Sequence, residues 1–374
     1  MMRAHKIRIY PNIKQRTLLE KHCGCARLAY NTCLAKWNQE YENGTKHNYF
    51  SIKKWFNGIK KDKYPFIYEV SKWSVEAAIA DLATAFKKFF RKETEHPIFH
   101  KKGIKDSFRI DSSVIKIDGH FLRLPKGLYL RMAEKLRYAT VIKIYNVTIS
   151  KTANRWFVSI QCEIPESKNQ AEGAVGIDLG ISQHAVLSDG TVFKNVKLEK
   201  TYRRKLARSQ RSLHRKQKGS KNRKKAQQRL ATVYWRMSNT RQDRIHKMTT
   251  TVTNKYSTIC LEDLNVKGIL SNHKLARSVS DVAFGEVCRQ FEYKAKQVNY
   301  VNRFEATSKP CCVCFKIHDM PLNKREMVCE CGNKIDRDLN AAINILRLAK
   351  PKVKPVERSK TSEKQESNGK RKFA

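Results

Sequence analysis

The spacing of apolar residues changes several times along the chain. Residues 3–10 (RAHKIRIY) alternate basic and apolar side chains, which is typical of a half-buried strand. In residues 73–90 (WSVEAAIADLATAFKKFF), apolar side chains recur at spacings of three and four, which predicts an amphipathic helix capped by Ser74. We expect helices over residues 13–95.

Short alternating runs replace this helical pattern between Phe108 and Ile164. Turns such as Asp-Gly and Pro-Lys-Gly separate the runs, as in a small antiparallel sheet or barrel. Because the strand at residues 3–10 has no partner near it in sequence, we predict that it pairs with this sheet. A barrel would then be built from residues 1–12 and 96–166, with the helical segment of residues 13–95 inserted into it.

A second domain is predicted from residue 167 onward, after a linker at residues 165–173. It opens with two apolar runs (AVGIDLGISQHAVLSDGTVF), and STICLEDLNV at residues 257–266 is predicted to form another buried strand. DVAFGEVCRQFEYKAKQ has the pattern of an amphipathic helix. Residues 350–374 lack apolar periodicity, so we expect a disordered basic tail.

Charge identifies the kind of partner. The 374 residues include 77 Lys and Arg against 34 Asp and Glu, a net charge of +43, and 40% are hydrophobic. This composition excludes disorder along the whole chain and favours a polyanion as partner. Residues 200–247 hold 18 Lys and Arg against one acid, Asp243, and are expected to form two basic helices broken near Lys218-Gly219-Ser220.

The residue pattern of the first ten positions is not the one expected of a signal-peptide core. No window approaches the roughly 18 uncharged apolar residues of a membrane span, and charges interrupt the apolar positions of MMRAHKIRIY. We therefore expect a cytoplasmic protein without a membrane partner.

Acidic residues occur at three places where apolar residues surround them. Asp178 lies inside AVGIDLGI, Glu262 and Asp263 close the run STICL, and Asp336 and Asp338 precede LNAAINIL. Burying a carboxylate costs several kcal/mol unless it is paired or binds a metal. Singly, each acid has a structural explanation, such as a helix cap at the third place. Together they match the layout of ribonuclease-H-like nucleases, in which carboxylates surround two divalent ions about 4 Å apart.

We select Asp178, Glu262 and Asp338 as catalytic ligands of two Mg²⁺ ions, with Asp263 and Asp336 as alternatives that the pattern leaves open. Mg²⁺ prefers oxygen ligands and keeps waters, which leaves room for phosphate oxygens. One ion would activate a water, and the other would stabilise the leaving 3′ oxygen.

Four cysteines have the spacing of a zinc site. Cys311 and Cys314 form a Cys-x-x-Cys pair, and fourteen residues separate it from Cys329-x-Cys331. Four thiolates would fill the tetrahedral coordination of one structural Zn²⁺. Cys312 and His318 stay open as alternative ligands because the second pair is short, and four unrelated buried thiols are the alternative explanation.

The motifs GIDLGI, CLEDLNV, the two cysteine pairs and DRDLNAAINIL occur in the order found in TnpB (OrfB) proteins of bacterial insertion sequences. KIRIYPNIKQRTLLEKHCGCARLAYN, LATAFKKFFRK and SDVAFGEVCRQFEYKA resemble that family as well, so the resemblance covers about residues 3–348. Two positions depart from the family pattern: the second cysteine pair is one residue short, and Phe315 replaces the usual Gly after Cys314.

The resemblance implies a mixed α/β, multidomain fold. It comprises a wedge-like β-barrel with an inserted helical recognition domain, and a RuvC-like nuclease domain at residues 167–309 and 332–349 with a zinc ribbon at 310–331. It also implies an RNA-guided, Mg²⁺-dependent DNA endonuclease encoded by a transposable element. Its partners would be a guide RNA from its own locus and duplex target DNA with a short flanking motif, bound by a monomeric prokaryotic ribonucleoprotein.

Basic residues of the 200–247 segment would contact a guide–target heteroduplex through its backbone, without sequence preference. The alternative explanation for the charge of this segment is a helix face that contacts only solvent. By resemblance, Tyr49, Phe50, Lys72 and Glu76 would lie near the flanking DNA motif. The expected backbone contacts are Arg203, Arg204, Lys205, Arg208, Arg211, Arg215, Lys216, Lys221, Arg223 and Lys224.

Three other functions compete with the guided endonuclease. A guided DNA-binding repressor without nuclease activity would not need all three acids. A transposase acting by strand transfer could use the same acids and ions. A basic RNA-packaging protein would explain the charge but not the buried acids.

Overall fold

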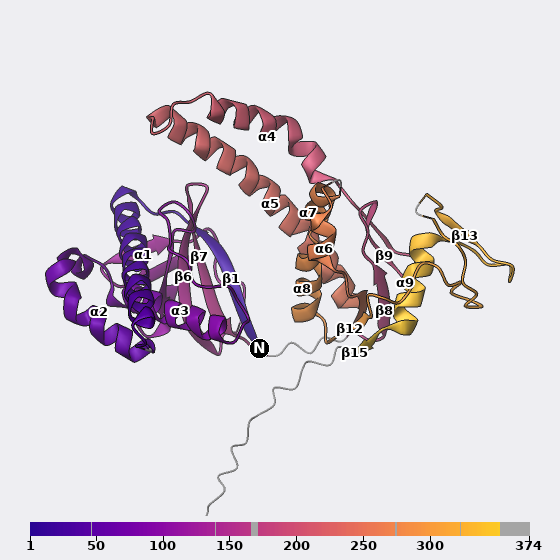
Figure 1. The fold of residues 1–374 in the computed structure, drawn as a ribbon, viewed down its shortest axis with the longest axis horizontal. Coiled ribbons are helices and arrows are strands. Elements are labelled where there is room, and N and C mark those ends of the chain that lie inside the picture. The colour runs from indigo at the N-terminus through magenta and orange to yellow at the C-terminus, as the bar shows by residue number, and fades with distance from the viewer. Residues whose placement is uncertain (46, 139, 166–170, 274, 322, 352–374) are drawn as a thin grey trace, which may run out of the picture. The chain divides into compact units, whose positions relative to one another are not determined.

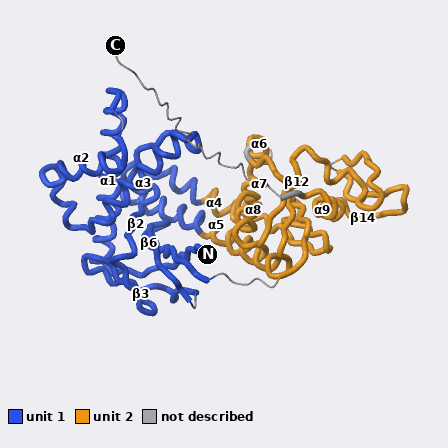
Figure 2. Tube along the Cα trace, turned by 90° about the horizontal axis from the view of Figure 1, so that it is seen from below, with its two compact units in different colours: residues 1–168, 209–235 blue, residues 169–208, 236–374 orange. Residues whose placement is uncertain are grey.

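The computed structural model describes the chain except residues 46, 139, 166–170, 274, 322 and 352–374. Most of the predicted linker and nearly all of the predicted tail lie outside the described residues. The chain forms two compact units, shown in Figure 2: unit 1 is Met1–Lys168 with Ser209–Trp235, and unit 2 is Asn169–Arg208 with Arg236–Ala374. The finer domain boundaries stay predictions.

Unit 1 contains a four-stranded antiparallel sheet in the order β1-β7-β6-β2. Along its full length β1 pairs with β7, so the predicted pairing of the first strand with the later sheet is confirmed. Alternation along β1 buries His5, Ile7 and Ile9 against the inner residues of β7. The strands are β1 (Met2–Ile9), β2 (Ser107–Asp111), β6 (Lys143–Thr152) and β7 (Arg155–Glu163).

A smaller sheet contributes to the same core. Strands β3 (Lys116–Asp118), β4 (Phe121–Leu124) and β5 (Leu128–Arg131) pair antiparallel in sequence order. The inner leucines of β4 and β5 are buried in one hydrophobic cluster with Ile7 and Ile9, and a bridge joins Ile9 to Met132. Two sheets around one core are compatible with a barrel. The barrel stays a prediction.

Three long helices follow β1 and supply the second core of unit 1. Asn12 begins α1 (Ile13–Glu42) with a reciprocal capping box to Gln15, both bonds 2.9 Å. Trp37 of α1 stacks on Phe86 of α3 at 4.3 Å between ring centroids. The other helices are α2 (Tyr49–Lys63) and α3 (Lys72–Phe90), with 3-10 turns at Pro65–Glu69 and Ser112–Val114.

The predicted cap of α3 was wrong. The helix begins at Lys72, and the N-cap position is Ser71. Ser74 is buried inside the first turn, where its hydroxyl donates to the Ser71 carbonyl at 2.7 Å. A serine three residues into a helix has this local bond available, so the residue type alone did not fix the start.

The basic segment folds as a helical hairpin, α4 (Leu198–His214) and α5 (Lys221–Lys255), whose break confirms the predicted one (Figure 1). Inside unit 1, Arg223 Nη1 donates to the carbonyls of Leu213 and Lys216 at 3.1 and 2.9 Å. This side chain thereby satisfies carbonyl groups at the end of α4 that the helix leaves free.

Unit 2 is built on a six-stranded sheet in the order β10-β9-β8-β11-β12-β15. The central strands β8, β11 and β12 run parallel, and the others are antiparallel to their neighbours. Strand β15 places two residues of the predicted tail in this sheet. The strands are β8 (Ala174–Asp178), β9 (Gln183–Leu187), β10 (Val192–Lys194), β11 (Thr258–Glu262), β12 (Gln297–Val301) and β15 (Lys350–Pro351).

Helices cover both faces of this sheet. Val175, Ile177, Ile259 and Leu261 pack with residues of α5 and of α8 (Phe284–Lys294) on one face. Cys260 and Val301 pack with Ile345 of α9 (Arg337–Leu348) on the other. The remaining elements of unit 2 are α6 (Val266–Ser271), α7 (Ala276–Val282) and a ribbon of β13 (Glu326–Val328) with β14 (Lys334–Asp336).

None of the helices in the described part of the chain combines the length and the apolar character that a membrane crossing would need.

Candidate functional site

Two of the selected acids end neighbouring parallel strands. Asp178 is the last residue of β8, and Glu262 is the last residue of β11. Cys260 pairs with Gly176, so continuing that register by two residues sets Glu262 opposite Asp178. Since successive side chains of a strand alternate between faces, both carboxylates belong to the face that α9 covers.

The third acid comes from the first turn of α9. This helix approaches β8 so closely that a Cβ at Gly176 would lie 2.0 Å from the Ala342 carbonyl oxygen and 2.6 Å from the Leu346 nitrogen. The approach needs a glycine, because no side chain fits between the strand and the helix. It brings Asp338 beside the end of β8.

The electrostatics place both Glu262 and Asp338 near Asp178. Burial and then the negative charges of Glu262 and Asp338 together raise the pKa of Asp178 to about 7. Burial and then the charge of Asp336 raise the pKa of Asp338. A cluster of carboxylates that resists ionisation is a favourable place for a cation.

The two alternative acids have structural partners. Asp263 forms an ion pair with Arg303, with 2.6 Å between Oδ2 and Nη2. Asp336 is the N-cap of α9 and accepts from the backbone N–H groups of Asp338 and Leu339 at 2.9 and 3.1 Å. These contacts favour Glu262 and Asp338 over their neighbours, a choice that the sequence pattern left open.

Sequence reasoning missed the hydroxyl of Thr307, which donates to Glu262 Oε1. Thr307 is buried and follows β12 in an irregular segment, so no periodicity marks it. Its hydrogen bond fixes one oxygen of Glu262.

We expect Asp178→Asn to stabilise the protein in magnesium-free buffer at alkaline pH. The folded pKa is about 7 and the unfolded pKa about 3.9, so the wild type loses stability as pH rises from about 4 to 7. The neutral amide avoids this loss, which amounts to about 2–4 kcal/mol at pH 8. Thermal melts should show a higher Tm for the variant at pH 8 and a gap less than half as large at pH 5. A gap independent of pH would contradict the raised pKa.

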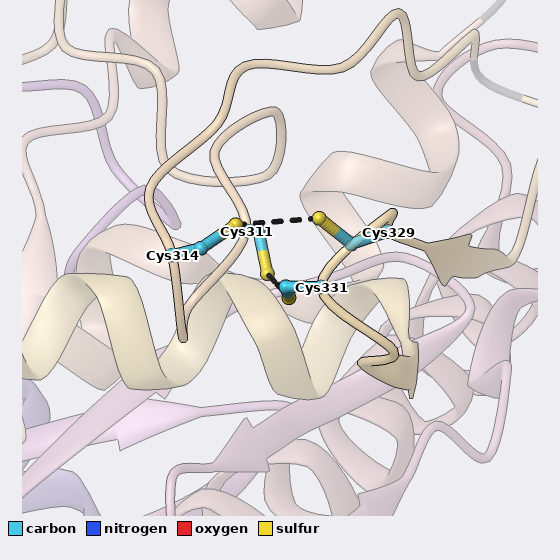
Figure 3. A group of neighbouring side chains, drawn as sticks. All are labelled: Cys311, Cys314, Cys329 and Cys331. Carbon is cyan, nitrogen blue, oxygen red and sulfur yellow. Dashed lines mark hydrogen bonds between the residues drawn. The ribbon is translucent and has the colours of Figure 1, made fainter.

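The four predicted zinc ligands come together in unit 2, as Figure 3 shows. Their sulfur atoms all lie within 4.8 Å of one another, with 3.8 Å between Cys311 and Cys331 and 3.3 Å between Cys314 and Cys329. Burial opposes ionisation of Cys311, but hydrogen bonds from the Cys314 N–H and the Asn333 side chain lower its pKa to about 6. Four convergent thiols can hold a zinc ion, and the shortened second pair does not prevent their approach.

Among the described residues, the four cysteines are the group of His, Cys, Asp and Glu close enough to hold one metal ion. The three carboxylates do not form so tight a group. Ligands arranged around two ions about 4 Å apart need not crowd together as single-ion ligands do.

The alternative zinc ligands differ in position. His318 Nε2 lies 3.1 Å from the Cys329 sulfur, whereas Cys312 uses its backbone N–H to bind Asn340 Oδ1 at 2.9 Å. Phe315 has φ +65°, a left-handed conformation that favours glycine, and its ring lies 3.7 Å from the Arg347 guanidinium. This conformation gives a backbone reason for the glycine that the resemblance implied at this position.

We expect about one zinc per chain by elemental analysis of purified protein. Cys311→Ser should lose the metal and lower the Tm, because three thiolates leave the tetrahedral site incomplete. The matched control Cys312→Ser should retain zinc, since its sulfur stands outside the cluster. Full zinc content in the Cys311 variant would show that these thiols are not the ligands.

The predicted nucleic-acid residues lie in two places. On the hairpin, the selected Lys and Arg are exposed except Arg223, which is half-buried and bonded to carbonyls at the end of α4. In the helical segment, Lys53 contacts both Glu76, at 3.0 Å, and the ring of Tyr49, at 5.5 Å from its centroid. Lys72 lies 5.2 Å from the Trp73 ring centroid. Lys53 is thus a neighbour that the sequence did not single out.

Three family profiles match the chain. OrfB_IS605, described as "Probable transposase", covers residues 157–273, and HTH_OrfB_IS605, described as "Helix-turn-helix domain", covers residues 1–46. The profile "Cas12f1-like, TNB domain" covers residues 284–345, which include the four cysteines. In the described part of residues 1–46, this chain has β1 and one continuous helix, α1.

Relatives match the chain over different lengths. "Putative RNA-guided DNA endonuclease" of Streptomyces pristinaespiralis is 36% identical over 360 residues, 92% of this chain and 88% of that protein. "Putative RNA-guided DNA endonuclease InsQ" of Escherichia coli (strain K12) is 32% identical over 78% of this chain and 77% of that protein. "TnpB-like protein L79" of Acanthamoeba polyphaga mimivirus is 33% identical over 34% of this chain and 26% of that protein.

The fold also resembles a solved structure, "Cryo-EM structure of the Cas12f1-sgRNA-target DNA complex". The TM-score is 0.57 at 12% identity, over 92% of this chain and 98% of that one. This likeness concerns the fold alone. The family assignment rests on the relatives found by sequence. The profile matches and the 36% identity across most of the chain confirm that it belongs to the TnpB (OrfB) family.

Proposed function

We propose that the protein is an RNA-guided, divalent-metal-dependent DNA endonuclease encoded by a transposable element. The observation that carries the proposal is the convergence of Asp178, Glu262 and Asp338 on one face of a sheet. The names of the Streptomyces pristinaespiralis and Escherichia coli relatives support guided DNA cleavage. The net charge of +43 supports polyanionic partners.

Each acid has a distinct origin within a RuvC-like arrangement. Asp178 and Glu262 extend from adjacent strand ends, and Asp338 from a helix held close by Gly176. The donor set fits Mg²⁺, because carboxylates are hard oxygen ligands and because burial and neighbouring negative charges raise the pKa of Asp178, so that a bound cation would favour its ionised form. Bound there, Mg²⁺ would supply an activated water and stabilise the leaving 3′ oxygen. Thr307 would keep Glu262 oriented toward the site.

The partners we propose are a guide RNA from the protein's own locus and duplex DNA with a short flanking motif. Exposed cations of the hairpin would hold the backbone of the guide–target heteroduplex. Tyr49, Lys72 and Glu76 would lie near the flanking motif, and the ion pair with Lys53 would orient Glu76.

The proposal is tested by reconstitution. The protein is purified with RNA transcribed from its own locus and given Mg²⁺ and matched duplexes that carry a library of flanking sequences. We expect cleavage that depends on the match, the flanking sequence and the metal. Joined strands would instead identify strand transfer. Absence of any cut across the library, with the RNA bound, would contradict the proposal.

For the hairpin, we expect charge removal to weaken nucleic-acid binding without changing its sequence preference. The triple variant Arg203→Gln, Arg204→Gln and Lys205→Gln removes three exposed charges of α4. The slope of log K against log salt should become shallower by about two to three. A control removes Lys316 and Lys334, which already pair with Glu330 and Glu326, and should change the slope little. Equal slopes for the triple variant and the parent would exclude these contacts.

A further inference from the structure

The three-stranded sheet β3-β4-β5 has an outer face whose composition the nuclease site does not explain. Leu122, Leu124, Leu128 and Leu130 alternate inward and are buried in the core of unit 1. The outward positions of the same strands carry aromatic and basic side chains. Strand β3 lies at the periphery of unit 1 (Figure 2). The outward residues are Lys116, Asp118, Phe121, Arg123, Tyr129 and Arg131.

Two of these outward side chains form an exposed aromatic pair. The rings of Phe121 and Tyr129 stack with 4.7 Å between centroids and 5° between planes. They remain 37% and 40% exposed. Because both rings stay this exposed, they offer flat aromatic faces to a ligand.

Cations alternate with the aromatic rings across the sheet. In the strand register Phe121 lies opposite Arg131, and Tyr129 lies opposite Arg123. The Arg123 guanidinium is 5.4 Å from the Tyr129 ring centroid. Asp118, opposite Phe121, offers an acceptor on the same face. The face therefore combines stacking surfaces with positive charge.

A hollow of about 640 Å³ adjoins this face, and Tyr10, His120, Phe121 and Arg131 line it together with Met132 and Ala133. The Tyr10 N–H donates to the Arg131 carbonyl at 2.9 Å, which joins the end of β1 to the end of β5. Tyr10 is 49% exposed, and the Arg8 guanidinium lies 4.9 Å from its ring centroid. A third aromatic side chain thus borders the stacked pair.

We propose that Phe121, Tyr129 and Tyr10 form a platform on which unpaired bases of a single-stranded nucleic acid stack, with Arg123 and Arg131 holding its phosphates. Aromatic faces bind any base, and adjacent cations bind the backbone, so the two features together suit single strands. This deepens the proposed function, on which it rests for the presence of RNA and displaced DNA strands. A purely structural cross-strand pair would stabilise the hairpin and bind no base.

The test measures binding of fluorescent oligouridylate and oligodeoxythymidylate to the full chain over a range of salt. The double variant Phe121→Leu and Tyr129→Leu keeps apolar side chains but removes the rings. We expect binding about fivefold to hundredfold weaker for at least one oligonucleotide. The salt slope should not change, because no charge is lost. A stronger effect on RNA would identify the guide as the source, and a stronger effect on DNA would identify a displaced strand.

Two controls separate stacking from folding and from charge. Tyr41 and Phe90 are another exposed aromatic pair of unit 1, at 6.1 Å between centroids, and their Leu variants should bind like the parent. Abasic oligonucleotides have the phosphates without bases, so the platform variant should bind them like the parent. Equal binding of base-containing strands by the platform variant and the parent, at equal Tm, would overturn the proposal.

If the double variant does not fold, crosslinking of the unaltered protein replaces it. Oligonucleotides substituted with 5-iodouracil should crosslink to peptides that contain Tyr10, Phe121 or Tyr129. Crosslinks confined to other peptides would overturn the platform. Guided cleavage with no platform crosslinks would leave the proposed function intact, so the two failures are distinguishable.

Discussion

Asp178→Ala should abolish DNA cleavage while the protein still binds its RNA and matched DNA. Asp178 lies at the end of β8, and burial together with the charges of Glu262 and Asp338 raises its pKa to about 7. Without it the pocket loses an oxygen ligand that the proposed metal chemistry needs. We expect the cleavage rate to fall by about a thousandfold or more, as when one member of a catalytic unit is removed.

The measurement is single-turnover cleavage of a matched duplex, with binding followed by gel shift. Asp263→Asn is the matched control, because Asp263 is the next acid along the chain from Glu262 but is engaged by Arg303. It should keep cleavage within about tenfold, in line with the small value of exposed ion pairs. Cleavage retained by the Asp178 variant, or lost equally in both variants, would refute the assignment.

The strand pattern of the sequence was sufficient to predict where the acids lie on the sheet. A lone Asp inside AVGIDLGI and an acid at the end of STICL both follow runs of apolar residues, and parallel neighbouring strands bring these ends together. The choice between neighbouring acids was beyond the pattern. That choice depends on the ion pair of Asp263 with Arg303, a residue 40 positions further along the chain, and on the capping bonds that Asp336 accepts at the start of α9.

The cysteine cluster was predictable because its spacing reflects local knuckle geometry. The shortened second pair left Cys312 and His318 open as alternative ligands, and only the three-dimensional positions of the sulfurs favour the four predicted cysteines. Phe315 shows a further limit: its backbone has the left-handed conformation that favours glycine, but a Phe in the sequence contains no sign of that conformation.

The pairing of β1 with the later sheet was predictable because an isolated amphipathic strand needs a partner, although the sequence did not single out β7. The stacked pair on β4 and β5 was not predictable. Alternation in FLRL and LYLR predicts which side chains face outward, yet stacking of Phe121 on Tyr129 depends on the register between strands, which the turn sets.

Gly176→Ala should be strongly destabilising, although it adds one methyl group. The new Cβ would lie 2.0 Å from the Ala342 oxygen and 2.6 Å from the Leu346 nitrogen, both backbone atoms of α9. Backbone cannot rotate away as a side chain can, so α9 must move off β8. We expect a loss of about 3 kcal/mol or more, at the upper end for overpacked cores, and a Tm lower by about 6–12 °C.

The same displacement of α9 should also slow DNA cleavage, because Asp338 lies in the first turn of α9 while Asp178 ends β8. A misplacement of about 1 Å can cost about a hundredfold in rate, so the folded fraction of the Gly176 variant should cleave at least that much more slowly.

Gly285→Ala is the matched control in the same unit. A Cβ at this position of α8 would have nothing within 4 Å of it, and helix propensity predicts a gain in stability of about 0.5–1 kcal/mol. Thermal melts and single-turnover cleavage of both variants decide the question. A Gly176 variant that melts and cuts like the parent would mean that α9 does not hold Asp338 against the sheet in the way described.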